Sequence, residues 1–345
     1  MKALVYHGPG MIAWEEKPKP AVQDATDAVV KITTTTICGT DLHILKGDVP
    51  EVTDGRILGH EGVGVVESVG AGVTSVKPGD KVLISCISSC GKCANCKKGM
   101  YSHCENGGGW VLGHLIDGTQ AEYVRVPFAD NSLYKAPPDV DEEALCMLSD
   151  IFPTGFECGV LNGEIKPGDT VAIVGAGPIG LAALLTAQFY SPARIIMVDM
   201  DENRLLTAKS LGATDLVHAG GRPVEEIMAL TGGKGADVVM EAVGVPPSFD
   251  ICQKIVAAGG HLASIGVFGK SVNLEIQRLW AHNITLRTRL VDTVSTPMLL
   301  KTVAAGKLQP SRLITHRFKL ADIMKAYDTF KKAADTKALK VIMAA

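Results

Sequence analysis

A glycine-rich turn that directly follows an apolar segment constrains the fold of this chain more than any other feature. Thr170–Val174 has the β-branched, apolar character of a buried strand, and the sequence GAGPIG and an apolar helical pattern follow it. In such a unit Gly175 permits the turn, Gly177 lets phosphates approach the backbone, and Gly180 lets the helix pack against the strand. Pro178 suits the first turn of the helix. The segment therefore predicts a dinucleotide site at a helix N-terminus, where free N–H groups attract phosphate.

The segments around this turn alternate between strand and helix patterns from about residue 170 to residue 284. Besides the first strand, we expect strands at Arg194–Asp199, Ala236–Glu241 and His261–Gly266. Helices are expected at Pro178–Tyr190, Glu202–Leu211, Pro223–Leu230 and Pro247–Ala257. This alternation is typical of a parallel sheet covered by helices, so it predicts a Rossmann domain over residues 153–289.

The end of the second strand favours one of the two common dinucleotides. Asp199 closes that strand. An acidic side chain at this place accepts hydrogen bonds from the ribose hydroxyls of NAD and repels the 2′-phosphate of NADP. Arg204 on the following helix favours NADP instead, because an arginine can contact a phosphate. The acidic strand end predicts NAD.

The regions on either side of this domain have a different pattern. Residues 1–85 carry short β-branched runs, for example Ala28–Thr36, Gly62–Val69 and Lys81–Ser85. Turn sequences such as KPGD separate them, which predicts an all-β, barrel-like unit. After about residue 290 helical patterns return, and a final strand is expected at Leu339–Met343.

Residues 86–118 form an irregular lobe that holds five of the nine cysteines. Four of them follow the spacing C-x2-C-x2-C-x7-C, namely Cys90, Cys93, Cys96 and Cys104. Such spacing lets four thiolates converge on a tetrahedral Zn²⁺ and close the site to solvent, as in structural zinc sites. A Cys-x-x-Cys redox pair and an iron–sulfur cluster are the alternatives. Because the lobe has little apolar material for a core, we expect a structural zinc ion to order it.

Three further residues with metal-binding side chains are scattered along the sequence. Cys38 lies in the segment TICGTDLH, His60 lies in GHEGVG, and Asp150 comes shortly before the sequence PTG. A catalytic zinc site uses about three protein ligands and keeps one position open for substrate. The spacing alone does not show whether these three side chains meet.

Together these features resemble the zinc-dependent medium-chain dehydrogenases and reductases, the family of the zinc alcohol dehydrogenases. The resemblance rests on the C-G-T-D-x-H motif, the G-H-E motif, the four-cysteine lobe, the GxGxxG turn and the terminal strand, all in family order. It implies an α/β fold in which residues 1–152 and 290–345 form a GroES-like β-barrel catalytic domain. The Rossmann domain is inserted in it, and the family active site lies in the cleft between the domains.

The resemblance also implies roles for the metal-binding residues. Cys38, His60 and Asp150 would bind the catalytic zinc. The aspartate departs from the usual Cys₂His set and resembles bacterial secondary-alcohol dehydrogenases; an oxygen ligand still suits Zn²⁺. Glu61 would lie behind the metal, where it either ligates zinc transiently or forms a buried ion pair.

The implied reaction is an alcohol oxidation. Zinc would act as a Lewis acid that stabilises the alkoxide, and hydride would pass to the nicotinamide. Thr40 and His43 would relay the hydroxyl proton through the cofactor ribose to solvent. Other positions resemble family contacts to the dinucleotide, namely Thr154, Ile179, Arg204, Ile265, Gly266, Val267, Arg289 and Leu290.

The remaining cysteines and histidines match no ligand spacing. Cys146, Cys158 and Cys252 fall in apolar helical patterns and are expected to be buried. Cys86, with Trp110, is expected to line the substrate pocket. The other histidines are expected at the surface or as hydrogen-bonded core residues, namely His7, His103, His114, His218, His261, His282 and His316.

Charge and hydropathy disfavour several other function classes. The formal net charge of −3 does not favour binding to nucleic acid or anionic membranes. No apolar run reaches the roughly 18–20 residues of a transmembrane helix, and the N-terminus lacks a secretory signal pattern. We therefore expect a cytoplasmic enzyme with a small-molecule substrate, two Zn²⁺ ions per chain and NAD. The family resemblance implies a homotetramer.

The expected function is reversible hydride transfer between small primary or secondary alcohols and NAD. A polyol or amino-alcohol dehydrogenase of the sorbitol or threonine type shares the same motifs, so only the pocket residues would separate the two. A zinc-free quinone reductase, or a nucleotide-binding protein without activity, is disfavoured because the chain keeps Cys38, His60 and the four-cysteine lobe.

Overall fold

The computed structural model describes all residues from 1 to 345 and contains two compact units. One unit combines both ends of the chain, Met1–Asp150 and Asp292–Ala345. The other is the continuous segment Ile151–Val291. The sequence patterns place the borders at 152/153 and 289/290, close to the borders between these units.

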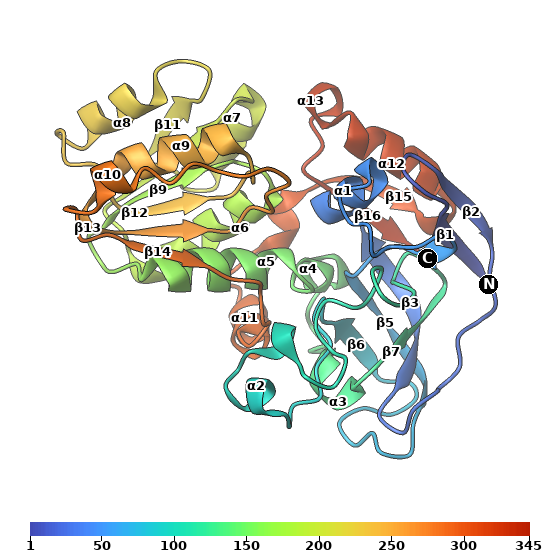
Figure 1. Ribbon diagram of the computed structural model, residues 1–345. Helices are drawn as coiled ribbons and strands as arrows, with labels where there is room; N and C mark the ends of the chain where they lie inside the picture. The colour runs from blue at the N-terminus through green and yellow to red at the C-terminus, as the bar shows by residue number, and fades with distance from the viewer. The chain divides into compact units, whose positions relative to one another are not determined.

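The unit Ile151–Val291 is built on a six-stranded parallel sheet (Figure 1). In spatial order the strands are β11 (Asp215–His218), β10 (Arg194–Asp199), β9 (Thr170–Val174), β12 (Ala236–Glu241), β13 (Val256–Ser264) and β14 (Thr285–Thr288). The chain runs outward from β9 to β11 on one side and from β12 to β14 on the other. Ligands of such sheets bind at the carboxyl ends of the strands, beside the point where the order reverses. That point lies between β9 and β12.

Helices cover both faces of this sheet. They are α5 (Ile151–Thr154), the π-helical segment η2 (Gly155–Leu161), α6 (Pro178–Ala187), α7 (Glu202–Ser210), α8 (Pro223–Leu230), α9 (Pro246–Ile255) and α10 (Ile276–Leu279). Figure 1 shows α9 on one face and α5 with α6 on the other. The strands are therefore buried on both sides, which explains the continuous apolar run in β9. Helix α7 begins where the Asp201 carboxylate accepts hydrogen bonds from the N–H groups of Asn203 and Arg204.

Most of the strands and helices expected in this unit are confirmed, with some differences. The helix expected to reach Tyr190 ends at Ala187 and continues as a 3-10 turn, η3 (Gln188–Tyr190). Strand β13 begins at Val256 and runs through a glycine pair, where its pairing with β12 shifts register. The strand was expected only from His261 to Gly266, and a helix was expected to reach Ala257. Strands β11 and β14 were not expected, because four residues are too few to show a clear pattern.

The other unit contains two β-sheets. The seven-stranded sheet has the order β15 (Ile314–Lys319), β16 (Lys340–Ala344), β3 (Ala28–Thr36), β5 (Gly62–Val69), β6 (Lys81–Ile84) and β8 (Leu133–Lys135), with β7 (Tyr123–Val126) paired to β3. The three-stranded sheet has the order β2 (Ile12–Glu16), β1 (Lys2–Tyr6) and β4 (Arg56–Ile57). Because β16 pairs with β3, the C-terminal strand completes a sheet that the N-terminal region begins.

Short helices connect and cover these strands. They are α1 (Gly39–Lys46), α2 (Ala94–Lys97), α3 (Ala129–Ser132), α4 (Glu142–Met147), α11 (Thr296–Ala304), α12 (Ile323–Lys331), α13 (Ala333–Thr336) and the 3-10 turns η1 (Tyr101–His103), η4 (Pro310–Leu313) and η5 (Leu320–Asp322). One apolar core joins Leu4, Ile37 and Ile44 to Tyr327 and Val341. This core fixes helix α1, and with it the position of Cys38.

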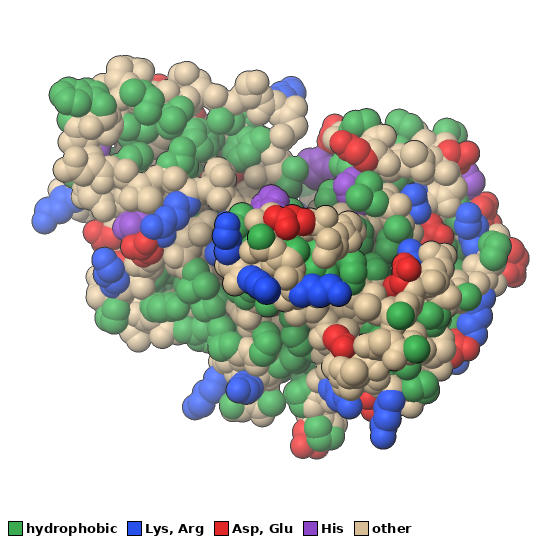
Figure 2. All heavy atoms as spheres, turned by 60° about the horizontal axis from the view of Figure 1, so that its bottom comes forward, with side chains coloured by type: hydrophobic (Ala, Val, Ile, Leu, Met, Phe, Trp, Pro, Cys, Tyr) green, Lys and Arg blue, Asp and Glu red, His purple; other side chains and the backbone are tan.

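The lobe at residues 86–118 has only α2 and η1 as regular structure. None of the helices combines the length and the apolar character needed to cross a membrane. On the face shown in Figure 2, lysine and arginine side chains are scattered among acidic and apolar ones.

Candidate functional site

The start of helix α1 presents Cys38. Cys38 is the N-cap residue, and its backbone N–H donates to the Asp41 carboxylate at 2.9 Å. The same carboxylate oxygen accepts a hydrogen bond from the Gln120 side chain at 3.0 Å, and the Gln120 carbonyl accepts one from the Tyr327 hydroxyl at 2.7 Å. All these side chains are buried, and burial raises the pKa of Asp41. A polar network inside the core therefore holds the thiol in place before any ligand arrives.

His60 and Asp150 approach Cys38 from two other segments. His60 comes just before β5, and Asp150 follows α4. The His60 Nε2 atom lies 3.3 Å from Asp150 Oδ2, and the Cys38 Sγ atom lies 3.8 Å from the same oxygen. With Glu61, the four residues offer ligand atoms within 4.8 Å of one another, and all four are buried.

This donor set fits a zinc ion. Zn–N and Zn–O bonds of about 2.0–2.1 Å in a tetrahedron put nitrogen and oxygen roughly 3.3–3.4 Å apart, as His60 and Asp150 are. A thiolate, a carboxylate and a neutral imidazole also balance the double charge of the ion. Three protein ligands would leave a fourth position for substrate.

Glu61 is held by a buried lysine. Lys340 at the start of β16 donates to both Glu61 carboxylate oxygens, at 2.7 and 2.8 Å, and to the Ile37 carbonyl at 3.2 Å. Each of the two side chains is only 1% exposed. Burial acts against the charge on Lys340, but the adjoining Glu61 raises the pKa of Lys340 above its usual value. Glu61 was expected either to ligate zinc transiently or to form a buried ion pair. The structure shows the ion pair, with Lys340 as the partner.

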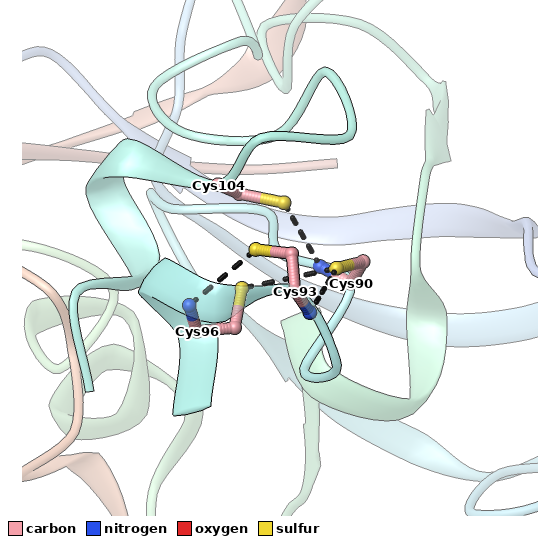
Figure 3. Close-up of side chains that lie close together, drawn as sticks. All are labelled: Cys90, Cys93, Cys96 and Cys104. Atoms are coloured by element: carbon pink, nitrogen blue, oxygen red, sulfur yellow. Dashed lines mark hydrogen bonds between the residues drawn. The ribbon is translucent and has the colours of Figure 1, made fainter. Parts of the chain in front are cut away.

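The four cysteines of the lobe also converge (Figure 3). Their sulfurs lie within 4.8 Å of one another, and the Sγ atoms of Cys90 and Cys96 are 3.8 Å apart. Tetrahedral Zn–S bonds of about 2.3 Å put sulfurs roughly 3.8 Å apart. Backbone N–H groups point at the sulfurs, with Cys96 donating to Cys93 and Cys93 donating to Cys90. The residues present therefore fit a closed zinc site.

The thiol pKa values show why this cluster needs a cation. Burial raises the pKa of Cys90, but N–H donors from Lys92 and Cys93 outweigh burial and bring that pKa to about 6. Burial and the adjoining Cys93 thiol raise the pKa of Cys96 to about 12. Like charges this close disfavour each other, so four thiolates coexist at neutral pH only around a positive ion.

In the other unit, the glycine turn has the shape that a phosphate cradle needs. Gly175 has φ +110°, and a Cβ on Gly180 would lie 1.8 Å from the Gly175 carbonyl oxygen, so neither position accepts a side chain. Around Gly177 the space is open, and the nearest neighbour of a Cβ would be an Arg204 nitrogen at 4.0 Å. Gly177 caps α6, with Pro178 in its first turn. The residues present therefore fit a pyrophosphate at this helix N-terminus.

Asp199 closes β10 beside this turn. Its Oδ2 atom accepts a hydrogen bond from the Ala176 N–H at 2.6 Å, and its Oδ1 atom accepts one from the Asp201 N–H at 2.8 Å. Asp199 therefore fixes the glycine turn. Each carboxylate oxygen keeps a further lone pair for a ribose hydroxyl.

Comparison with known proteins decides the family. The family model described as alcohol dehydrogenase GroES-like domain matches residues 24–138, and the model described as zinc-binding dehydrogenase matches residues 178–304. An alcohol dehydrogenase of Cupriavidus necator is 36% identical over 97% of this chain and 96% of its own length. The chain belongs to the zinc-type alcohol dehydrogenases.

Two further relatives refine this assignment. The structure of zinc dependent alcohol dehydrogenase 2 from Streptococcus pneumonia matches this dehydrogenase with a TM-score of 0.96 and 55% identity, over 100% of this chain and 98% of that chain. An NADP-dependent isopropanol dehydrogenase of Thermoanaerobacter brockii is 35% identical over 96% of this chain and 95% of its own length. The expected family and the GroES-like plus Rossmann fold are confirmed. The choice of dinucleotide must be argued from this dehydrogenase's own residues, because the family includes NADP enzymes.

Both residues expected to relay a proton lie on α1 of the dehydrogenase. The Thr40 hydroxyl is 3.6 Å from the Cys38 sulfur. His43 is about one helical turn further on, half-buried, and its Nδ1 atom lies 2.8 Å from the Asp48 carboxylate. Residues three apart share one helix face, so Thr40 and His43 line the same side of α1.

The remaining residues expected near the dinucleotide all lie in the Rossmann unit. Ile265, Gly266 and Val267 follow β13 at the carboxyl edge of the sheet, and Val267 is 66% exposed. The Arg289 guanidinium lies 4.0 Å from the buried Glu157 carboxylate. The others are placed as follows: Thr154 ends α5, Ile179 lies in the first turn of α6, and Leu290 is exposed after β14.

The expected burial of three cysteines is confirmed, and the pocket position expected for Cys86 stays a prediction. The expectation for the other histidines is wrong at two positions. Cys146, Cys158 and Cys252 are buried. The Cys86 sulfur is 3.7 Å from the second oxygen of Asp150, so Cys86 adjoins the candidate metal site. His114 and His261 were expected at the surface or with their hydrogen bonds made, yet the Nε2 atom of His114 and the Nδ1 atom of His261 are buried without a partner.

Sequence reasoning missed two buried charged residues of the dehydrogenase. Lys340 stands at the start of an otherwise apolar strand, and a lysine there is the signal that could have revealed the ion pair. Glu241 closes β12 at the strand-order reversal, and its Oε1 atom accepts hydrogen bonds from the Val243 and Gly244 N–H groups and the Ser248 hydroxyl. Glu241 thereby fixes the turn after β12, as Asp199 fixes the turn after β9.

Proposed function

We propose that this alcohol dehydrogenase uses NAD to interconvert small primary or secondary alcohols and the corresponding aldehydes or ketones. The observation that carries the proposal is the convergence of Cys38, His60 and Asp150 in one buried cluster. In this proposal these residues hold a catalytic zinc ion, and the four cysteines of the lobe hold a structural one. When bound, zinc supplies Lewis-acid catalysis and NAD supplies the hydride acceptor.

The side chains of this chain supply the rest of the chemistry. The Asp41–Gln120–Tyr327 network keeps Cys38 oriented, and the carboxylate of Asp150 adds the second negative charge that a divalent ion needs. The Thr40 hydroxyl lies beside the Cys38 sulfur, and it would take up the proton that the alcohol loses while it passes its own proton on toward His43. His43 would then release a proton to solvent, because an imidazole ring can accept a proton at one nitrogen and donate one from the other.

Asp199 supports NAD as the dinucleotide. Its carboxylate is fixed by two backbone N–H groups, so its negative charge stays at the end of β10. A 2′-phosphate would meet that charge, whereas ribose hydroxyls would donate hydrogen bonds to it. Replacing Asp199 with glycine should raise the kcat/KM ratio of NADP to NAD by at least about tenfold. An unchanged ratio would contradict the assignment of Asp199.

The proposed function is tested by assaying NADH formation with purified, zinc-replete protein. The alcohols are ethanol, longer primary alcohols, 2-propanol, 2-butanol, benzyl alcohol, sorbitol and threonine, each with NAD and with NADP. Turnover of simple alcohols with NAD is the expected result. Turnover of sorbitol or threonine alone would place the protein with the polyol or amino-alcohol enzymes, and no turnover with any alcohol would contradict the proposal.

We also propose a homotetramer in the cytoplasm. The proposal follows the family resemblance, and light scattering after size-exclusion chromatography tests the assembly. A mass four times that of the chain is expected; the mass of one or two chains would contradict it.

A further inference from the structure

The two carboxylate oxygens of Asp150 have different neighbours. Oδ2 lies 3.3 Å from His60 Nε2 and 3.8 Å from Cys38 Sγ, so it faces the other two proposed zinc ligands. Oδ1 instead accepts a hydrogen bond from the Cys86 thiol, with 3.7 Å between sulfur and oxygen. Cys86 and Asp150 are both buried. One oxygen of Asp150 is thus directed at the metal cluster, while the other is bonded to a neighbouring side chain.

The hydrogen bond from Cys86 has a favourable environment. A thiol is a weak donor, but a metal-ligating carboxylate is ionised, and hydrogen bonds to ionised acceptors are stronger than those between neutral groups. The buried surroundings strengthen the bond further, because the local dielectric is low. The Cys86 thiol can therefore hold the orientation of the Asp150 side chain.

Backbone contacts fix Cys86 in this place. Its N–H donates to the Ser149 carbonyl oxygen at 3.1 Å, directly before Asp150 in the chain. The Ser149 hydroxyl accepts a hydrogen bond from the Gly62 N–H at 3.1 Å and donates to the Gly62 carbonyl oxygen at 3.3 Å. Gly62 begins β5, two residues after His60. The segments that carry Cys86, Asp150 and His60 are thus tied together by hydrogen bonds.

The residue before Cys86 is anchored as well. The Ser85 hydroxyl lies 2.9 Å from the Thr293 hydroxyl and accepts a hydrogen bond from the Ile87 N–H at 3.1 Å. Ser85 and Thr293 are buried. The chain on both sides of Cys86 is therefore held, so the direction of its thiol is set by the fold.

The number of Asp150 oxygens on the metal decides whether the site stays open. Carboxylates bind metal ions through one oxygen or through both. A catalytic zinc site with three protein ligands keeps its fourth position for substrate. If both oxygens of Asp150 bound the ion, the second would compete with the substrate for that position.

We propose that Cys86 is a positioning residue that keeps Asp150 a one-oxygen ligand, with Oδ2 on the metal and Oδ1 on the thiol. This inference rests on the proposed function and adds a residue to which that function gives no role. Cys86 acts through Asp150, and in this role it contacts neither the metal ion nor the substrate.

Three variants separate the hydrogen bond from the volume of the side chain. Cys86→Ala and Cys86→Val both remove the donor, but one leaves space and the other fills it. Cys86→Ser has nearly the volume of the alanine variant and restores a donor. Cys86→Ala and Cys86→Val should each lower kcat/KM for 2-propanol by about tenfold or more, and Cys86→Ser by less than about threefold. The loss should appear mainly as a higher KM, because substrate must displace the second oxygen.

Cobalt substitution reports the coordination directly and needs no turnover. Four-coordinate Co²⁺ absorbs visible light more strongly than five-coordinate Co²⁺, so the spectrum distinguishes a one-oxygen from a two-oxygen carboxylate. The absorption from Co²⁺ in the lobe is subtracted with Cys38→Ser, which lacks a ligand of the catalytic site. Per bound ion, Cys86→Ala and Cys86→Val should absorb less than the wild type, and Cys86→Ser should match it.

Cys146→Ala is the matched control. Cys146 is another buried thiol of the same unit, on α4, and the structure shows no hydrogen bond between it and Asp150. This variant should keep the wild-type KM and the wild-type cobalt spectrum.

The outcomes distinguish this inference from the proposed function. Wild-type KM and cobalt absorption in Cys86→Ala and Cys86→Val would overturn the role of Cys86 and leave the proposed function standing. A Cys86→Ser protein as impaired as those two would also overturn it, because the donor would then not matter. A wild type that turns over no alcohol would count against the proposed function, and the cobalt spectra of the variants would still decide the role of Cys86.

Discussion

The two candidate metal sites lie in the same unit, yet they are built in opposite ways. The Cys38–His60–Asp150 cluster is surrounded by apolar core and by buried polar partners such as the Asp41–Gln120 and Glu61–Lys340 pairs. The lobe around Cys90–Cys104 has one four-residue helix, one 3-10 turn and mostly exposed or half-buried residues. The folded core holds the ligands of the first site in place, whereas in the lobe the bound ion has to hold the surrounding chain in place.

This contrast indicates what each ion does. A ligand set that is rigid before the ion arrives can leave one coordination position open, because the core and not the ion keeps the ligands in place. A ligand set in a loop needs a closed site with four protein ligands, because the ion replaces the missing core. The predictions below test this difference, starting with the largest expected effect.

Removing a ligand from the rigid cluster should abolish catalysis and preserve the fold. Residues that only orient a zinc ligand typically contribute 10–100-fold, and a direct ligand contributes more. Cys38→Ser should therefore lower kcat/KM by at least about 100-fold while circular dichroism and the unfolding midpoint stay close to wild type. An active Cys38→Ser enzyme would contradict the assignment of Cys38 as a ligand of the catalytic zinc ion.

Removing one partner of the buried ion pair should damage stability. Lys340→Met leaves the Glu61 carboxylate buried without its partner, so we expect a loss of about 3–5 kcal/mol in the free energy of unfolding. The double variant Glu61→Gln/Lys340→Met should recover most of this loss in urea unfolding. If the single variant is as stable as the wild type, the rigid cluster does not depend on this pair.

Removing a ligand from the lobe should disorder it without removing the catalytic ligands. Losing a structural metal is a large perturbation, and about 3 kcal/mol would lower the unfolding midpoint by roughly 6–12 °C. Cys93→Ser should also open residues 90–104 to limited proteolysis. The control is Cys252→Ala, a buried thiol outside both clusters, which should leave the lobe protected.

A carboxylate next to the lobe is expected to make a small, pH-dependent contribution to the free energy of unfolding. Asp130 on α3 accepts hydrogen bonds from the N–H and hydroxyl groups of Thr74 and Ser75. Burial raises the pKa of Asp130, but these donors outweigh burial and lower that pKa to about 2. A lowered carboxyl pKa stabilises the fold above the unfolded value near 4, and this stabilisation is lost as the pH falls toward 2. Because the group is exposed, Asp130→Asn should cost only about 0.5 kcal/mol at pH 7.

The measurement is urea unfolding of wild type and Asp130→Asn between pH 7 and pH 3. The difference in the free energy of unfolding between the two proteins should become smaller below about pH 5. A difference that stays constant over this range would show that the charge of Asp130 does not contribute.

The sequence predicted local patterns well and spatial convergence poorly. Hydrophobic runs predict the Rossmann strands, and the spacing of the glycines in GAGPIG predicts the turn, so both are recognised within short stretches of sequence. The four lobe cysteines lie within one short segment, and their spacing already indicates convergence. Cys38, His60 and Asp150 come from segments far apart, so only their resemblance to a family, and then the structure, brought them together.

Single buried polar residues were the hardest to predict. Lys340 and Glu241 each stand at one end of an apolar strand, where a charged residue normally faces solvent, and their partners lie elsewhere in the chain. His114 matched no ligand spacing, and nothing in the sequence indicates that its Nε2 atom is buried without a partner. Such features arise from tertiary packing and leave no periodic signal.

The most direct test of this account is the zinc content of three purified proteins, measured by inductively coupled plasma mass spectrometry alongside alcohol oxidation. The account predicts two zinc ions per chain in the wild type and one in each of Cys38→Ser and Cys93→Ser. Cys38→Ser should be inactive and folded, and Cys93→Ser should be less stable but retain activity while folded. A Cys38→Ser protein that keeps two zinc ions and oxidises alcohols would contradict the account.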